Sequence, residues 1–465
     1  MTVVDIHCHV FNADDLPVRG FLHRVHLHNA PLGAAAAGLL DRVVQGFAPG
    51  FARDMARLDA LLGGEVGPDA AQAAQASQDF EADVERTFIL LQATDPDLLA
   101  HAGTALVAEE AGVGALGQVS LSDVLDASKR LLRWVMLFGR SRLDLVANLV
   151  RDFDNQLDLA IPLLVDLGTG LGDVATTTGR QQVELFEKLS RATMRGVLPD
   201  VGDVRLHPFV GFDPLSELRA RRADAIEKPL DLVRTAVAEY GFVGVKVYPP
   251  MGWRPTGNRE RPGLPREDAD ELDRIVHDLA EWCAADDVPI TAHSADTNYA
   301  DPTYQEFGSP EEWLALLDAH PGLRLNLGHF GGVPTGGRPQ RIAAAMAMRP
   351  GLYADIGNHG VGDEAELQAY FDMLAALMST SDLAERLMYG SDWYMVAAQK
   401  GYQAFLQTYR TRYTEEFGAD RAAGFLGGNA LSFLGFDDPA NLNNRRLTAR
   451  YQRFAPENLP NWLKQ

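Results

Sequence analysis

Val3-Val4-Asp5-Ile6-His7-Cys8-His9-Val10 is a short apolar run, broken by one acid, that ends in two histidines two positions apart. A run of this length and composition predicts a buried β-strand. Alternate side chains of a strand share a face, so His7 and His9 are expected to point to the same side. An open doubly wound sheet normally carries a glycine-rich phosphate turn after its first strand. His-Cys-His stands in that place here, which favours a closed barrel.

Seven further β-rich runs follow along the chain, and those after residue 200 alternate with amphipathic helical stretches. This alternation is typical of repeated βα units with a parallel sheet. Eight runs are the number that a (β/α)₈ TIM barrel requires. We therefore predict an α/β fold in which residues 1–465 form a single barrel domain, with an open doubly wound sheet as the alternative. The seven runs are Ala160–Leu167, Val204–Phe212, Phe242–Tyr248, Val288–His293, Leu323–His329, Leu352–Ile356 and Leu387–Ser391.

A long segment, residues 13–158, separates the first two predicted strands. It contains helical patterns such as Ser122–Phe138 and Leu143–Asp152, which predict a mostly helical insertion in the first βα loop. Loops that follow the strands of a barrel surround its active site, so the insertion is expected to wall or roof that site. Residues 436–465 are polar and rich in Asn and Arg, and we interpret them as a C-terminal extension that wraps the outside.

The formal net charge is −22, from 42 Lys+Arg against 64 Asp+Glu. Such a field repels phosphate backbones and anionic lipid, which argues against nucleic acid and membrane partners. Two cysteines, Cys8 and Cys283, imply no disulfide framework, and no run approaches the roughly 18 apolar residues of a membrane span. The first residues carry no basic segment typical of a secretory signal. A small-molecule substrate and a reducing cytoplasm are therefore expected.

Three later strand ends carry residues able to bind a metal: His293, His329 and Asp392. Catalytic residues of this fold come from the C-terminal ends of different strands. Each residue alone is more typical of a core histidine or a helix cap. Together with His7 and His9 they predict a site for Zn²⁺ or a similar ion. His26-Leu27-His28 has the same spacing but follows no strand, so we interpret it as ordinary insertion histidine.

Several motifs around these positions are similar to motifs of a known protein family. They are Asp5-Ile6-His7-Cys8-His9, His207-Pro208-Phe209-Val210-Gly211-Phe212-Asp213-Pro214, Gly244-Val245-Lys246-Val247-Tyr248-Pro249-Pro250, His329-Phe330-Gly331-Gly332, Tyr389-Gly390-Ser391-Asp392 and Gly428-Asn429-Ala430. On these motifs the chain resembles the amidohydrolase superfamily, in particular the amidohydrolase 2 branch that groups with aminocarboxymuconate-semialdehyde decarboxylase. The resemblance covers the first strand and nearly everything after the insertion, whereas the insertion itself matches nothing familiar.

The resemblance implies that His7, His9, His293 and Asp392 bind a single divalent metal, most often zinc, with manganese as an alternative. It implies that His329 is the catalytic histidine. Neutral imidazoles and a carboxylate leave an open position on the metal, where a water is acidified toward a pKa of about 7. Asp392 can orient that water and move its proton, while His329 polarises the substrate or stabilises an oxyanion.

Lys246 allows two interpretations. It stands in a Gly-x-Lys-x-Tyr-Pro context, in which the resemblance allows the lysine to be carbamylated and to bridge two metals, with His329 as a ligand of the second. Otherwise Lys246 is a cation that binds a substrate carboxylate or pairs with Asp392. A structural, unpaired lysine is disfavoured because a buried lone charge is costly.

The loop after the fourth predicted strand supplies candidate substrate-binding residues, Tyr248, Trp253 and Arg254, and Trp393 is a further candidate. Aromatic walls with one guanidinium suit a planar or carboxylated organic substrate. The alternative is a rigid structural loop with Trp253 packed beneath it.

Two reactions fit these residues. The first, which we expect, is hydrolysis of an amide, ester or lactone by a metal-activated water, with Asp392 moving the proton. The second is decarboxylation or hydration of an unsaturated or aromatic acid, with Lys246 or Arg254 holding its carboxylate. A non-catalytic metal-binding scaffold would require an idle His329. Barrels often form closed symmetric oligomers, so a homo-oligomer is an alternative to a monomer here.

Overall fold

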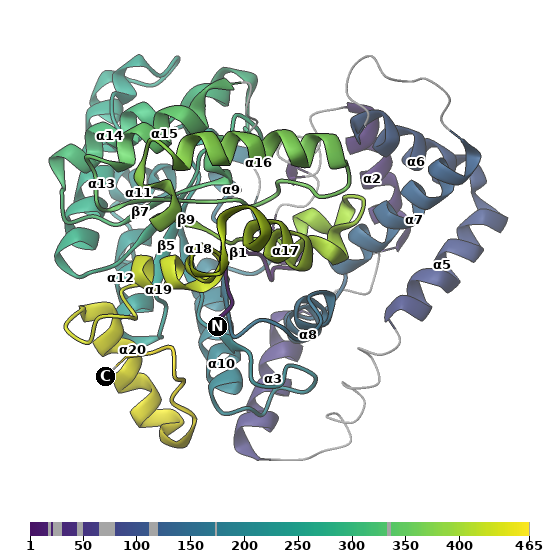
Figure 1. The fold of residues 1–465 in the computed structure, drawn as a ribbon, viewed down its shortest axis with the longest axis horizontal. Coiled ribbons are helices and arrows are strands. Elements are labelled where there is room, and N and C mark those ends of the chain that lie inside the picture. The colour runs from purple at the N-terminus through teal and green to yellow at the C-terminus, as the bar shows by residue number, and fades with distance from the viewer. Residues whose placement is uncertain are drawn as a thin grey trace.

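The computed structural model describes residues 1–16, 20–21, 30–43, 50–64, 80–110, 120–172, 174–332 and 336–464. Within these ranges it shows an α/β fold with two parallel sheets. Figure 1 shows the strands surrounded by helices of the second half of the chain, with the purple and blue helices of the first third mostly to one side. No helix of the described part is long and apolar enough to cross a membrane.

In the described ranges, nine strands make up the two sheets, and every neighbouring pair is parallel. The first sheet contains β1 (Val4–Cys8), β2 (Leu159–Pro162) and β3 (Arg205–Leu206). The second contains β4 (Phe209–Phe212), β5 (Gly244–Val247), β6 (Ile290–His293), β7 (Leu325–Gly328), β8 (Leu352–Asp355) and β9 (Leu387–Met388).

Two isolated bridges join these sheets at both edges. Cys8 pairs with Trp393, in the segment that follows β9, and Leu163 pairs with Phe209 at the start of β4. Parallel pairing therefore continues from β1 through β9 and back to β1. All eight predicted strands are present, although the third is divided into β3 and β4. The division falls at Pro208, which has no N–H to donate to a neighbouring strand.

Helices fill the chain between these strands. Those between β1 and β2 are α2 (Ala30–Val43), α3 (Phe51–Gly63), α5 (Phe80–Thr94), α6 (Pro96–Glu110), α7 (Leu121–Leu137) and α8 (Arg142–Asp152). Those up to β9 are α9 (Gly168–Leu171), α10 (Gly179–Met194), α11 (Pro214–Arg222), α12 (Pro229–Glu239), α13 (Arg266–Ala285), α14 (Pro310–Ala319), α15 (Arg338–Met346) and α16 (Glu364–Met378). After β9 come α17 (Phe405–Phe417), α18 (Ala419–Ala423), α19 (Asn429–Leu434) and α20 (Leu442–Phe454).

Short 3₁₀ turns occupy several loops: η2 (Pro249–Met251), η3 (Asn258–Glu260), η4 (Pro302–Gly308), η5 (His329–Gly331), η7 (Asp382–Glu385), η8 (Met395–Ala398), η9 (Tyr402–Ala404) and η11 (Pro456–Asn458). A π-helical turn, η10 (Gly424–Gly428), precedes α19.

Local sequence explains where the main helices begin. Ser120 starts α7 with a capping box closed by Asp123, and Thr178 starts α10 in the same way with Gln181. Asp213 caps α11 through backbone N–H groups of that helix's first turn. These caps satisfy N–H groups that have no partner inside their own helix.

The insertion is fastened to the segment after β1 by a buried charge network. The guanidinium of Arg142, at the start of α8, lies 2.7 Å from Asp15 Oδ1 and 3.2 Å from Asp54 Oδ2. All three side chains are almost fully buried. Charges removed from water in this way require close partners, so α3 and α8 are tied to the first βα loop.

The C-terminal stretch does more than wrap the outside. Tyr451 and Trp462 are buried and belong to the same apolar cluster as Val4 and Leu159 of the sheet. His207 contacts this stretch, because its Nε2 is 3.1 Å from the Tyr451 hydroxyl. Burial lowers the pKa of His207 to about 3, as expected for a structural histidine. The C-terminal extension therefore forms part of the apolar core around Val4 and Leu159.

Candidate metal centre

The bridge between the first and last strands brings three predicted ligands together. His7 and His9 lie at the end of β1, and Asp392 follows β9. His9 Nε2 is 3.1 Å from Asp392 Oδ1, and His7 Nε2 is 3.6 Å from the same oxygen. All three residues are buried, and one ligand atom of each lies within 4.8 Å of the others. Their backbones are joined as well, because the Asp392 N–H donates to the His7 carbonyl over 2.6 Å.

Hydrogen bonds turn both histidines toward this point. His7 Nδ1 lies 3.0 Å from each carboxylate oxygen of Asp355, and His9 Nδ1 lies 2.9 Å from the Leu163 carbonyl. An Nδ1–H that donates in this way leaves the Nε2 lone pair free. His7 Nε2 is buried without a hydrogen-bond partner in the described part of the chain. Burial lowers the pKa of His7 to about 4 against the opposing pull of Asp355, so the ring is neutral at neutral pH.

Asp355, at the end of β8, is the important residue that the sequence interpretation missed. Besides His7, it accepts hydrogen bonds from Asn326 Nδ2 (2.7 Å) and from the backbone N–H groups of His329 (3.1 Å) and Gly357 (2.8 Å). Burial alone would raise the pKa of Asp355, but the contacts with His7 and Asn326 hold it below its usual range. A carboxylate behind a ligating histidine is typical of metal sites.

His293 and His329 form a second pair beside the first. His293 Nε2 is 3.0 Å from the Thr297 carbonyl, and His329 Nδ1 is 3.0 Å from the Gly357 carbonyl. The remaining nitrogens, His293 Nδ1 and His329 Nε2, are 3.0 Å apart. Burial holds the pKa of His293 well below its usual range. When each ring donates to its carbonyl, the two facing nitrogens both present lone pairs, which is an arrangement that needs a cation.

His293 is not one of the three residues that share a point within 4.8 Å. It reaches that group through His329, whose ring centroid is 4.6 Å from that of His293 and 4.8 Å from that of His7. The His329 ring therefore lies between the rings of His7 and His293, two of the predicted ligands.

The strand ends that carry these residues are strained. The φ angles are 62° at His329 and 58° at Asp392, in the left-handed region that side chains other than glycine rarely adopt. Both residues are buried, at 6% and 3% exposure. Backbone strain of this kind persists where the surroundings hold it, and it concentrates at functional sites.

Lys246 of β5 lies near the same centre. Its Nζ is buried with no hydrogen-bond partner among the described residues, and it stands 5.5 Å from the centre of the Tyr248 ring. Burial lowers the pKa of Lys246 to about 8, while Asp355 and Asp392 oppose the shift. The Tyr248 ring in turn stacks on His293 at 4.3 Å. Lys246 and Tyr248 thus border the histidine cluster.

The other predicted substrate-binding residues lie elsewhere. Trp253 is 1% exposed and packs against Trp313, so its burial favours the alternative of a structural loop. The guanidinium of Arg254 is occupied by Glu312, 2.8 Å away. Trp393 is fully buried, and its indole N–H donates to Asp152 Oδ2. The pair His26-Leu27-His28 lies outside the described residues.

The donor set fits a divalent metal. Two imidazole nitrogens and one carboxylate oxygen, with a third imidazole nearby, are the ligand types that bind zinc in catalytic sites. The unpartnered His7 Nε2, and the His293 Nδ1 that faces His329, are polar atoms that such an ion would satisfy.

Several solved structures resemble this chain, whereas no curated protein matches it. A zinc-bound amidohydrolase from Burkholderia multivorans has 15% identity, with 65% of this chain and 91% of that chain covered, and a TM-score of 0.40. A 2,6-dihydroxybenzoate decarboxylase from Rhizobium has 17% identity, coverage of 62% and 87%, and a TM-score of 0.38. A putative 2-pyrone-4,6-dicarboxylic acid hydrolase from Pseudomonas putida has 14% identity, coverage of 62% and 87%, and a TM-score of 0.35.

The chain was also compared with models of protein families. The amidohydrolase family model, Amidohydrolase 2, matches residues 202–436, just over half of the chain. The match spans Lys246, His293, His329, Asp355 and Asp392, and it leaves out β1 and the insertion. The chain belongs to the amidohydrolase 2 family.

Proposed function

We propose that this protein is a metal-dependent hydrolase that acts on an amide, ester or lactone of a small organic substrate, on a closed (β/α)₈ barrel with a helical insertion after its first strand. The observation that carries the proposal is the meeting of His7, His9 and Asp392, with both imidazole Nε2 atoms directed at one carboxylate oxygen.

His7, His9, His293 and Asp392 would hold the ion, and zinc is the metal that this donor set suits best. When bound, such an ion supplies Lewis acidity and makes a water nucleophilic at neutral pH. The Asp392 carboxylate, whose Oδ1 lies beside both imidazoles, would orient the attacking water and take up its proton. His329 Nε2, which carries no proton when Nδ1 donates to Gly357, faces the same space and can receive or return a proton during cleavage.

Lys246 and Tyr248 border the place where substrate would bind. A buried ammonium without a partner stabilises negative charge, so Lys246 suits the oxyanion of a carbonyl under attack. Tyr248 stacks one face on His293, and its other face would be the one to pack against a planar substrate. A carbamylated Lys246 would instead help to hold two ions, with His329 as a ligand of the second.

A decarboxylase is the second candidate, and the same lysine favours it. An unpaired buried ammonium is also a binding site for a substrate carboxylate. In that reaction the substrate loses CO₂, and a protonated His329 would deliver a proton to the carbon left behind. Release of CO₂ from an unsaturated or aromatic acid would establish this alternative, whereas appearance of a carboxylate from an ester, amide or lactone would establish the hydrolase.

Metal content tests the proposal directly. Protein purified without chelators is expected to contain about one zinc or manganese per chain by elemental analysis. His9→Ala, which removes one donor, is expected to contain much less, while Asp203→Asn, at a fully exposed carboxylate, serves as the control. About two ions per chain would indicate the carbamylated form. No metal, and none taken up on titration, would contradict the proposed function.

A further inference from the structure

The insertion between β1 and β2 contacts the loop that carries Asp392, and this contact has a defined chemistry. Trp393 follows Asp392 directly and is fully buried. Its indole N–H donates to Asp152 Oδ2 over 2.9 Å, and Asp152 is the last residue of α8 in the insertion. One hydrogen bond therefore connects the insertion to the residue next to a predicted metal ligand.

Asp152 is itself held firmly. The Arg133 guanidinium, from α7, lies 3.0 Å and 3.3 Å from its two oxygens. Arg133 also pairs with Glu81 of α5 at 2.8 Å and lies over the ring of Tyr402 at 5.2 Å. The side chains of Arg133 and Asp152 are 9% and 7% exposed, so water competes little for this ion pair. Three insertion helices thereby fix the acceptor of the Trp393 indole.

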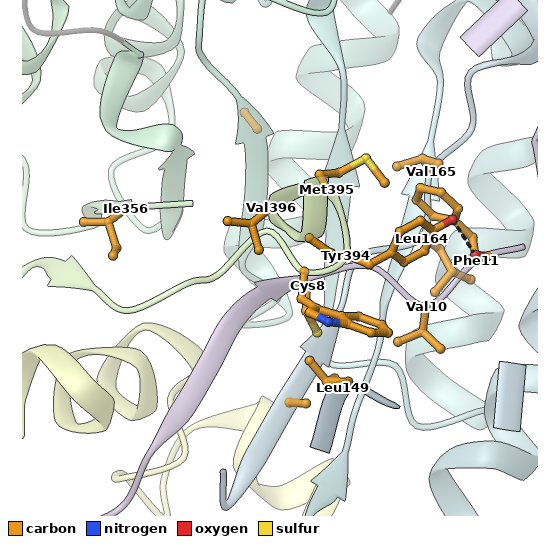
Figure 2. Packing of buried hydrophobic residues seen from close by; sticks show 14 of the residues in the cluster. Cys8, Val10, Phe11, Leu149, Leu164, Val165, Ile356, Tyr394, Met395 and Val396 are labelled. Atoms are coloured by element: carbon orange, nitrogen blue, oxygen red, sulfur yellow. Dashed lines mark hydrogen bonds between the residues drawn. The ribbon is translucent and has the colours of Figure 1, made fainter. Parts of the chain in front are cut away.

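A second contact runs beside the first. The Tyr394 hydroxyl donates to the Phe11 carbonyl over 2.9 Å, as the dashed line in Figure 2 shows. The Tyr394 ring also packs edge-on against Phe138, at the end of α7, with 5.2 Å between centroids. Figure 2 draws Leu149 of α8 in the same buried cluster as Cys8 and Tyr394. The loop after Asp392 is thus enclosed by the insertion and by the segment after β1.

Asp392 needs such support, because its φ of 58° lies in the left-handed region. From the β1 side, backbone hydrogen bonds hold this loop: the His9 N–H donates to the Trp393 carbonyl, and the Asp392 N–H donates to the His7 carbonyl. The indole anchor at Asp152 adds a side-chain restraint that is independent of β1.

We propose that the insertion acts as a clamp on the metal centre, with Asp152 as a positioning residue that holds Asp392, through Trp393, in the geometry needed to bind a divalent cation. This inference rests on the proposed function. It assigns a role to α5, α7 and α8, which lie outside the segment matched by the family model.

The experiment compares Zn²⁺ affinity among variants of the full chain. Metal-stripped proteins are titrated with Zn²⁺ in competition with a chromophoric chelator, and the visible spectrum of the Co²⁺-loaded forms reports ligand geometry. Trp393→Phe keeps an aromatic ring but removes the N–H, and Asp152→Ala removes the acceptor. Each is expected to weaken Zn²⁺ binding by about 10-fold or more and to alter the Co²⁺ spectrum.

Three further variants sharpen the test. Asp152→Asn keeps an oxygen acceptor for the indole and is expected to retain affinity within about threefold of wild type. The double variant Asp152→Ala/Trp393→Phe is expected to lose about as much affinity as one single variant does, because both substitutions remove the same bond. Asp203→Asn, at an exposed carboxylate outside the clamp, is the control and is expected to bind Zn²⁺ as wild type does.

The outcomes separate the two proposals. Unchanged affinity and spectrum in folded Trp393→Phe and Asp152→Ala, with folding checked by circular dichroism, would overturn the clamp alone. Additive losses in the double variant would also overturn it. Wild-type protein that binds no Zn²⁺ would contradict the proposed function and the clamp together. If Asp152→Ala does not fold, Trp393→Phe and Asp152→Asn decide the question.

Discussion

His293 Nδ1 lies 3.0 Å from His329 Nε2, while the other nitrogen of each ring lies 3.0 Å from a backbone carbonyl. Two neutral rings cannot satisfy this arrangement without a shared proton or metal ion. The two histidines therefore belong to one functional unit, but they are expected to differ in what each does.

Replacing His293 by Ala is expected to lower metal content, whereas replacing His329 by Ala is expected to leave about one ion per chain and to lower kcat by about 10²- to 10⁴-fold. The reason is that, in the proposed function, His329 acts on substrate while His293 is a ligand. Elemental analysis and turnover of an ester, amide or lactone substrate measure the two effects. A His329→Ala protein that loses its metal would make His329 a ligand, and unchanged turnover would remove it from the mechanism.

Asp355→Asn is expected to weaken zinc binding by about 10- to 100-fold, because the carboxylate fixes the tautomer and orientation of His7. Chelator competition measures the loss. Asp318→Asn is the matched control, since it makes the same change in an exposed carboxylate that pairs with Arg349. Equal affinities in the two variants would show that His7 is oriented without Asp355.

Lys246→Met is expected to leave metal content at about one ion per chain and to lower kcat/KM, because the methionine fills the buried space without the charge. Elemental analysis and steady-state kinetics measure both quantities. A fall from about two ions to one or none would instead identify Lys246 as a carbamylated bridging ligand.

Asp166→Asn is expected to stabilise the fold at alkaline pH. Burial, with the neighbouring charge of Asp213, raises the pKa of Asp166 from 3.8 to about 7. Between these values the folded state keeps a proton that the unfolded state has lost, so stability falls as pH rises and the loss is complete above pH 7. Asparagine resembles the protonated acid and avoids this loss.

The melting temperature of Asp166→Asn is therefore expected to exceed that of wild type by about 2–4 °C at about pH 8, with a much smaller difference at about pH 4. Asp203→Asn, at an exposed carboxylate, is expected to show no such pH-dependent gain. A difference that is the same at both pH values would contradict the raised pKa of Asp166.

The first and last strands show what sequence alone could predict. The two-residue period of a strand places His7 and His9 on one face, and the order of strand ends places Asp392 beside them in a barrel. Both inferences need only local pattern and topology. The break at Pro208 was also readable in principle, since proline cannot donate within a sheet.

Asp355 shows why the rest was missed. It lies in the apolar run Leu352–Ile356 and contacts His7, 348 positions away, so no local pattern connects the two. A usable signal existed nonetheless, because an acid inside a buried strand requires a partner. The contact of Trp393 with Asp152 could not be predicted for a similar reason, because no sequence motif specified how the insertion packs.

The pairing of β1 with the chain next to β9 has a consequence for the order of assembly. The Ser391 N–H donates to Asp5 across 386 positions of sequence, at the seam where the first strand meets the last. During synthesis His7 and His9 emerge long before Asp392, the carboxylate with which they would share the proposed metal. A bound metal ion would therefore favour the paired first and last strands, and zinc at about 100 times its dissociation constant would add about 2.7 kcal/mol against opening of that seam.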